Sequence, residues 1–336
     1  MSETRKLNHK IFIVKIPRIE KNLIVSLRRT YTLSKIHYLV SFLLISGFWL
    51  NGCSVKKIAV NSVADALTSE GTSVFATDND PQLVAEALPF ALKTMESLLQ
   101  SVPENRDLLV ATSAGFMQYG YAFVQWPAEK LEKENLAKSR EQKQRAKKLF
   151  LRARSYGLEA LEVRYRGFAD SLRVNPDKIL EEMDVKDVPA LYWTGVSWIA
   201  AISVDKGDFA LVADLSLVVN ILERCLTLDE DWQNGAIHEI LMSVDAARSE
   251  TEGGGIERAK THYMKALELN EGKSVGIKVS YAESICIPLQ DRETFKKLLH
   301  EVIAFDVDEY IEYRLVNILA QDKARFLLDN IDDYFF

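Results

Sequence analysis

The 336-residue sequence has only three cysteines, eight prolines and fifteen glycines. Proline and glycine are largely confined to short breaks such as "SVPEN", "VNPDK" and "TEGGG", and the alternation of polar and apolar residues that marks a β-strand hardly appears. Cys225 and Cys286 are the only cysteines after Cys53. They could pair in an oxidising compartment, but each lies in an apolar helical pattern, so we predict two separate buried thiols. These scarcities favour an all-α fold.

The common motifs of catalysis and metal binding are also missing. His238-Glu239 has no second histidine four residues on, "GGG" at 253–255 lacks the spacing of a nucleotide-binding loop, and no Gly-x-Ser-x-Gly elbow is present. We therefore predict that the protein is not an enzyme, with no cofactor and no metal. His238 is interpreted as a hydrogen-bonded core or turn residue rather than a ligand.

No apolar run is long enough to span a membrane, since the longest, from Tyr38 to Leu50, has about 13 residues and a span needs about 20. Residues 1–52 carry nine Lys and Arg against two Glu. A basic leader with a short apolar core is typical of a signal peptide, although the segment before Tyr38 is unusually long for an n-region. Leu50-Asn51-Gly52-Cys53 resembles the lipobox of bacterial lipoproteins. This resemblance predicts cleavage before Cys53 and lipid on its sulfur; an uncleaved or cytoplasmic leader is the alternative.

Charge changes sharply after the leader. The whole chain has 42 basic and 48 acidic residues, and removal of the leader's nine and two leaves 33 and 46, a net charge of −13. Phosphate binding needs a concentrated basic face, so we predict no nucleic-acid partner. The charged stretch at 129–148 mixes both signs and is interpreted as a solvated helical face.

One segment predicts the kind of helical packing. "AKTHYMKALELN", residues 259–270, resembles the second helix of a tetratricopeptide repeat. Small residues at Ala259 and Ala266 would let a partner helix approach closely, and Tyr263 would fill the groove between them; Leu267 is a further packing position of the repeat. Weaker copies surround Ala146, Leu222 and Met95. We therefore predict that residues 53–336 form a single domain of divergent repeats, stacked into a compact superhelical or ring-like structure and tethered through Cys53.

Four longer stretches point to one family, and they occur in this order: "LLVATSAGFMQYGYAFVQ" (108–125), "VPALYWTGVSWIAAIS" (188–203), "LDEDWQNGAIHEILM" (228–242) and "GGGIERAKTHYMKALEL" (253–269). Over about residues 41–331 the chain resembles the T component (TatT) of tripartite ATP-independent periplasmic (TRAP) transporters. The resemblance implies a periplasmic lipoprotein that forms a homotrimer and partners the solute-binding P component. It also implies an apolar hole in each protomer for hydrophobic solutes. Ser54 after the lipobox cysteine favours the outer over the inner membrane.

The aromatic residues of these stretches are candidates for lining such a pore. Trp193 and Trp198 lie five residues apart, which separates them by about 140° on a helix, so both cannot face one narrow stripe. Tyr192, Trp193, Trp198 and Tyr119 are each candidates for pore lining or for packing between helices. Two functions remain open: a transporter accessory that docks a solute-binding protein, and a general helical-repeat scaffold for envelope proteins.

Overall fold

The computed structural model describes residues 74–336, which belong to one compact unit. Within these residues the chain is helical with no strand, which confirms the predicted all-α class. The repeat type stays a prediction, and the leader and Cys53 lie outside the described residues. In chain order the α-helices are α3 (Pro81–Leu99), α4 (Arg106–Gly120), α5 (Trp126–Lys130), α6 (Leu136–Arg164), α7 (Phe168–Val174), α8 (Pro176–Glu181), α9 (Val188–Val204), α10 (Phe209–Val212), α11 (Leu215–Leu228), α12 (Ala236–Ala246), α13 (Ile256–Asn270), α14 (Gly276–Tyr281), α15 (Arg292–Ala304) and α16 (Arg314–Asp329).

Shorter segments connect them. Two are π-helical, η1 (Tyr121–Gln125) after α4 and η5 (Ala282–Cys286) after α14. The others are 3₁₀ turns: η2 (Val185–Asp187), η3 (Trp232–Asn234), η4 (Glu250–Glu252), η6 (Ile311–Tyr313) and η7 (Ile331–Asp333).

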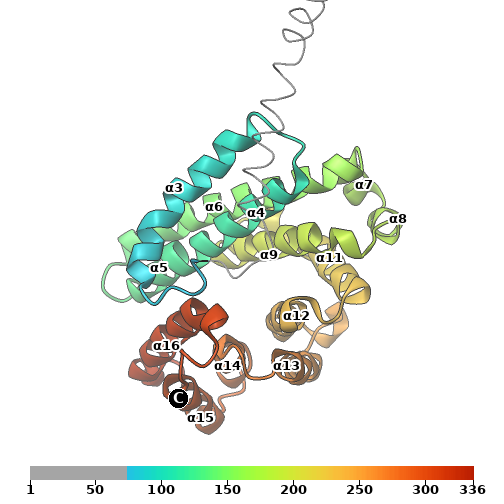
Figure 1. Ribbon diagram of the computed structural model, residues 1–336. Helices are drawn as coiled ribbons and strands as arrows, with labels where there is room; N and C mark the ends of the chain where they lie inside the picture. The colour runs from blue at the N-terminus through green and yellow to red at the C-terminus, as the bar shows by residue number, and fades with distance from the viewer. Residues whose placement is uncertain (1–73) are drawn as a thin grey trace, which may run out of the picture. The chain divides into compact units, whose positions relative to one another are not determined.

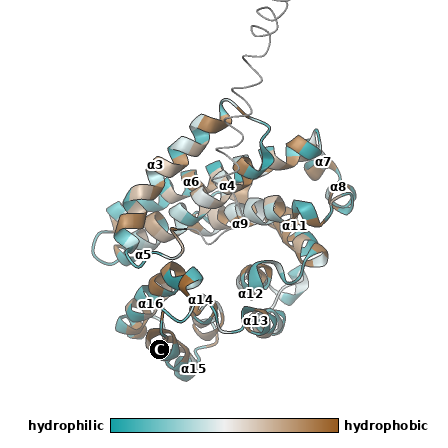
Figure 2. Cartoon of the chain, in the orientation of Figure 1, coloured by the Kyte–Doolittle hydropathy of each residue, from teal (hydrophilic) through white to brown (hydrophobic). Residues whose placement is uncertain are grey.

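Local sequence explains where many helices begin. The carboxylate of Asp80 accepts hydrogen bonds from the backbone N–H groups of Gln82 and Leu83, and Pro81 occupies the first turn of α3. Asp291 caps α15 in the same way, because its carboxylate accepts a hydrogen bond from the backbone N–H of Thr294 (3.0 Å). Most helices carry both polar and apolar faces (Figure 2). The charged stretch at 129–148 runs from the end of α5 into the largely exposed first half of α6, as expected of a solvated face.

The N-terminal helices α4, α6 and α9 pack closely because small residues lie where they cross. A Cβ atom added to Gly157 of α6 would lie 3.2 Å from the Cα of Thr194 in α9. The same Cβ atom would overlap the hydroxyl oxygen of Thr194, so this side chain would have to move before the two helices could keep their present separation. Helix α9 is buried on nearly every side, which explains why its sequence is apolar without a clear stripe.

Helices α12 and α13 form the pair in which the repeat-like segment lies. Ala259 and Ala266 are buried, at 0% and 1% exposure, with Tyr263 buried and Leu267 partly buried beside them. A Cβ atom added to Gly235, at the start of α12, would lie 3.1 Å from the Cα of Ala266. The two helices therefore meet at their small residues, although whether this pair is a true tetratricopeptide repeat stays a prediction.

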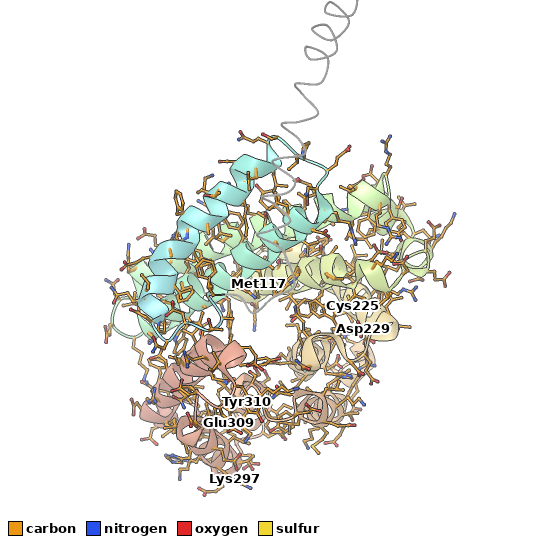
Figure 3. The ribbon with its side chains drawn as sticks, viewed as in Figure 1. Met117, Cys225, Asp229, Lys297, Glu309 and Tyr310 are labelled. Atoms are coloured by element: carbon orange, nitrogen blue, oxygen red, sulfur yellow. The ribbon has the colours of Figure 1, made fainter. Side chains whose placement is uncertain are left out.

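Cys225 of α11 and Cys286 of η5 are both buried and free, which confirms the preference for separate thiols over a disulfide. Figure 3 shows Cys225 near Asp229, at the C-terminal end of α11 and next to α12. Burial raises the pKa of the Cys286 thiol to about 12, so it stays protonated and inert at neutral pH.

The last helix returns to the first. The N–H of Leu315 donates to the carbonyl of Ala76 (3.0 Å), and the Arg314 guanidinium donates to the carbonyl of Thr77 (3.0 Å). Helix α16 thus lies beside the helices at the start of the described chain, and the helices form a closed circuit (Figure 1). The region where α16 meets three earlier elements, α3, η1 and α5, is called the seam below.

Candidate functional site

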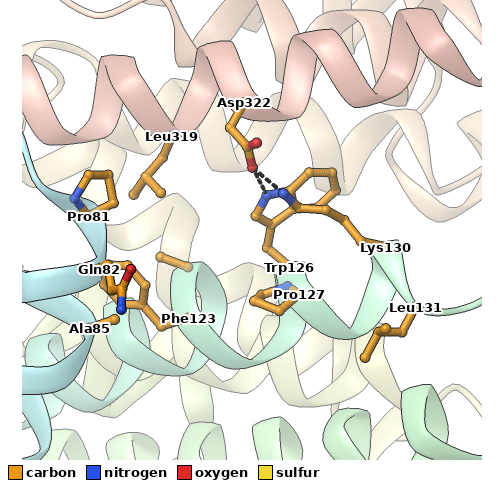
Figure 4. Close-up of a pocket in the computed structure, with 11 residues that line it drawn as sticks. Pro81, Gln82, Ala85, Phe123, Trp126, Pro127, Lys130, Leu131, Leu319 and Asp322 are labelled. Atoms are coloured by element: carbon orange, nitrogen blue, oxygen red, sulfur yellow. Dashed lines mark hydrogen bonds and ion pairs between the residues drawn. The ribbon is translucent and has the colours of Figure 1, made fainter.

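An open groove lies along the seam, with a volume of about 480 Å³ (Figure 4). This volume falls within the range of small-molecule sites. The lining is largely apolar, and its polar side chains are those of Gln82, Lys130 and Asp322. The lining residues are Pro81, Gln82, Ala85, Ala122, Phe123, Trp126, Pro127, Lys130, Leu131, Leu319 and Asp322.

Asp322 of α16 anchors one wall of the groove to the other. Its Oδ2 atom accepts from the indole Nε1 of Trp126 (2.8 Å) and from the Nζ of Lys130 (2.6 Å). The edge of the Trp126 ring also meets the ring of Phe326, with centroids 5.2 Å apart. Burial opposes ionisation, but the bonds from Lys130 and Trp126 hold the pKa of Asp322 below its usual value. The groove therefore has a fixed, ionised edge.

The next residue, Lys323, lies over two aromatic rings and between two carboxylates. Its Nζ atom is 2.9 Å from Glu283 and 3.9 Å from Glu129. It also lies 5.6 Å from the ring centre of Tyr121 and 5.2 Å from that of Trp126. Burial lowers the pKa of Lys323, but the nearby Tyr121 and the two carboxylates outweigh it and raise the pKa overall. Lys323 therefore stays charged and joins the last helix to the first part of the circuit.

Both π-helical segments contribute to this cluster, Tyr121 from η1 and Glu283 from η5. Such segments are rare and are frequently found at functional sites. Sequence reasoning missed the cluster, because its members are up to about 200 residues apart and each looks like an ordinary surface residue in its own helix.

A second aromatic group, which we call the α9 cluster, consists of Tyr192, Trp193 and Trp232. The ring centres lie 4.3 Å apart for Tyr192 and Trp232, and 5.1 Å apart for Tyr192 and Trp193. Burial raises the pKa of Tyr192, and the nearby carboxylate of Glu239 in α12 adds to this effect. Glu239 also accepts a hydrogen bond from the hydroxyl of Ser280 (2.9 Å). Burial raises the pKa of Glu239, and no ion pair to it occurs within residues 74–336.

The four aromatic residues predicted to line a pore are all buried. Trp193 contacts the α9 cluster, whereas Trp198 lies against Arg154 and Arg173, so the two tryptophans do face different directions. Tyr119 lies near Phe123, with ring centres 6.0 Å apart. None of the four lines the seam groove, and none lines a smaller groove beside Arg173 and Asp214. A pore-lining role for Tyr119, Tyr192, Trp193 and Trp198 stays a prediction.

Other features of the described chain bear on the class of protein. No helix within residues 74–336 is long and apolar enough to cross a membrane. The same residues contain no group of three His, Cys, Asp or Glu side chains placed to hold a metal ion. His238 is buried and pairs with His262, as a core histidine would.

Comparison with known proteins identifies the family of this chain. Residues 77–335 match the family model of the TRAP transporter T-component. An uncharacterized protein of Treponema pallidum (strain Nichols) is 32% identical over 303 residues, which cover 84% of this chain and 93% of that protein. The chain belongs to the TRAP transporter T-component family.

Proposed function

We propose that this protein is a periplasmic lipoprotein that docks the solute-binding P component of a TRAP-type transporter and offers it an apolar site for hydrophobic solutes. Membership of the T-component family supports a role in this transport system. The proposal includes lipid attachment at Cys53, anchoring at the outer membrane and assembly as a homotrimer. It assigns the protein no catalytic step.

The observation that carries the proposal is the apolar lining of the seam groove. Water-exposed apolar surface is costly, and Phe123, Leu131 and Leu319 would be covered by a hydrophobic solute or by an apolar part of the partner. A scaffold that recognises peptides would use mainly polar anchors, and only Gln82, Lys130 and Asp322 among the lining residues are polar. The mainly apolar lining favours the transporter accessory over the general scaffold.

A lipid anchor would strengthen this role. Tethering both proteins near one membrane raises their effective concentration toward each other, so even a weak contact becomes productive. The same tether gives little advantage with a freely diffusing partner.

The test is binding of the full chain to a TRAP-type solute-binding protein from the same organism, together with binding of the uncharged apolar dye N-phenyl-1-naphthylamine. Leu319→Arg places a charge in the groove and is expected to weaken dye binding by at least about tenfold. Leu289→Arg is the matched control, because Leu289 is 48% exposed and does not line the groove. No complex at tens of micromolar, with equal dye binding by both variants, would contradict the proposal.

A further inference from the structure

Arg154 of α6 is a partly buried guanidinium without a carboxylate partner. Within residues 74–336 its side chain makes no ion pair and no hydrogen bond, and its Nε atom is buried without an acceptor. Its contact is with the face of Trp198, where the guanidinium carbon lies 4.6 Å from the ring centre. Because Trp198 is only 2% exposed, this ring is a rigid platform.

A second arginine approaches the same ring. The guanidinium carbon of Arg173 lies 5.9 Å from the centre of Trp198. Arg173 is already paired, since its two Nη atoms donate to the two carboxylate oxygens of Asp214 at 3.1 and 3.4 Å. Arg154, Arg173 and Asp214 therefore carry a net charge of +1 together, and the unpaired positive charge is that of Arg154.

The surroundings make this charge costly in the absence of a ligand. Burial lowers the pKa of Arg154, the carboxylate of Asp214 partly offsets that effect, and the neighbouring Arg173 adds to it. An arginine held in this way gains more from an added anion than a fully hydrated one does, because part of its desolvation has already occurred.

The structure assigns Arg154, on its Trp198 platform beside Arg173, as a docking site for the acidic side chain of a protein partner. The planar fork of a guanidinium matches a carboxylate in two parallel hydrogen bonds. One uncompensated positive charge balances one carboxylate, whereas a phosphate group carries up to two negative charges. This site goes beyond the proposed function, because it is separate from the seam groove.

The surface next to the arginines fits a protein partner. A groove of about 340 Å³ continues from Arg173 and Asp214, and it is lined by Leu172, Arg173, Pro176, Ala213, Asp214, Ser216, Leu217 and Asn220. Val174, directly after Arg173, is 85% exposed. An arginine on an aromatic ring beside small apolar surfaces is the composition typical of protein interfaces.

The test follows the indole N–H signal of Trp198 in the full chain by NMR. The probe is the capped dipeptide N-acetyl-Leu-Glu-amide, with N-acetyl-Leu-Gln-amide as the uncharged comparison, both at constant ionic strength. We expect the acidic probe alone to shift the signal in a saturable manner at millimolar concentration. Arg154→Gln should weaken its binding by at least about tenfold, the scale of a lost charge-assisted hydrogen bond. Arg154→Lys, which keeps the charge but not the fork, should fall between the two.

Arg140→Gln is the matched control, because Arg140 is an exposed arginine on the same helix and its loss changes the net charge equally. This variant should bind the acidic probe within about twofold of the wild type. Equal binding by Arg154→Gln and the wild type would overturn the assignment. So would a shift produced by inorganic phosphate or by phosphatidylglycerol vesicles but not by the acidic dipeptide. None of these measurements uses the P component, so they test the Arg154 site even if the transporter proposal is wrong.

Discussion

The Nδ1 atoms of His238 and His262 lie 2.7 Å apart and join α12 to α13 inside the helical pair. The Nε2 atom of His238 lies 3.3 Å from Glu230, and that of His262 lies 3.4 Å from Asp245. Both imidazoles are buried. With a short Nδ1 to Nδ1 contact, one ring must donate and the other must accept, so the pair cannot hold two full positive charges without breaking this bond.

This pair predicts loss of stability in acid. Burial lowers the pKa of His238, and burial together with the neighbouring His238 lowers that of His262 to about 4 from 6.5. The unfolded chain therefore binds more protons than the folded chain as pH falls from 6.5 toward 4. We expect His262→Gln to flatten the pH dependence of unfolding by about 2 kcal/mol across this window, measured by urea denaturation. His300→Gln, at an exposed histidine of α15, should leave the slope unchanged. Equal slopes for all three proteins would contradict the prediction.

Gly157→Ala tests the crossing of α6 and α9. The added methyl would overlap the hydroxyl of Thr194 and crowd its Cα, so we expect roughly 1–3 kcal/mol of destabilisation despite the better helix propensity of alanine. The control is Ser155→Ala on the exposed side of α6, which should change stability by less than about 0.5 kcal/mol. A Gly157→Ala protein that melts at or above the wild-type temperature would show that the two helices can separate freely.

Ala266→Phe tests the contact of α13 with α12. The larger ring would overpack a site that is 1% exposed, at a cost of roughly 1–3 kcal/mol in the free energy of unfolding. Met264→Phe introduces the same ring at a position that is 64% exposed and should be close to neutral. The measurement is the melting temperature of each variant. Indistinguishable melting curves for Ala266→Phe and Met264→Phe would exclude repeat-like packing at Ala266.

Asp322→Ala tests the seam. It removes the acceptor for Trp126 and Lys130, and we expect a loss of about 1 kcal/mol together with faster amide exchange in α5 and α16. Asp329→Ala removes an exposed carboxylate from the same helix and serves as the control. If hydrogen exchange of α5 were the same in both variants, Asp322 would not hold the circuit closed.

Cys53→Ser tests membrane tethering. The native N-terminus is expected to begin at Cys53 with acyl mass on its sulfur, and the substitution should abolish both cleavage and membrane retention. Intact mass spectrometry of the native protein is the direct measurement. A mature chain that retains residues 30–50, or an unacylated Cys53, would refute lipid attachment.

Local sequence was sufficient to predict the all-α class and the buried, separate thiols, because each depends on the residue pattern within single helices. The family was recognisable from four stretches that together span residues 108–269. The small residues of the repeat-like segment were also identifiable, since Ala259 and Ala266 fall on one face by spacing alone. The 140° separation of Trp193 and Trp198 predicted that they face different surroundings, and they do.

Only the tertiary structure placed Lys323 between Glu283 and Glu129, His238 against His262, and Arg154 over Trp198. In the sequence each of these residues resembles a solvated charge or an isolated core position. Their pairing depends on how helices cross, which is set by the summed packing of many side chains and not by any local pattern. The same reason explains why the seam groove could not be foreseen: it exists because α16 returns to α5, nearly 200 residues away along the chain.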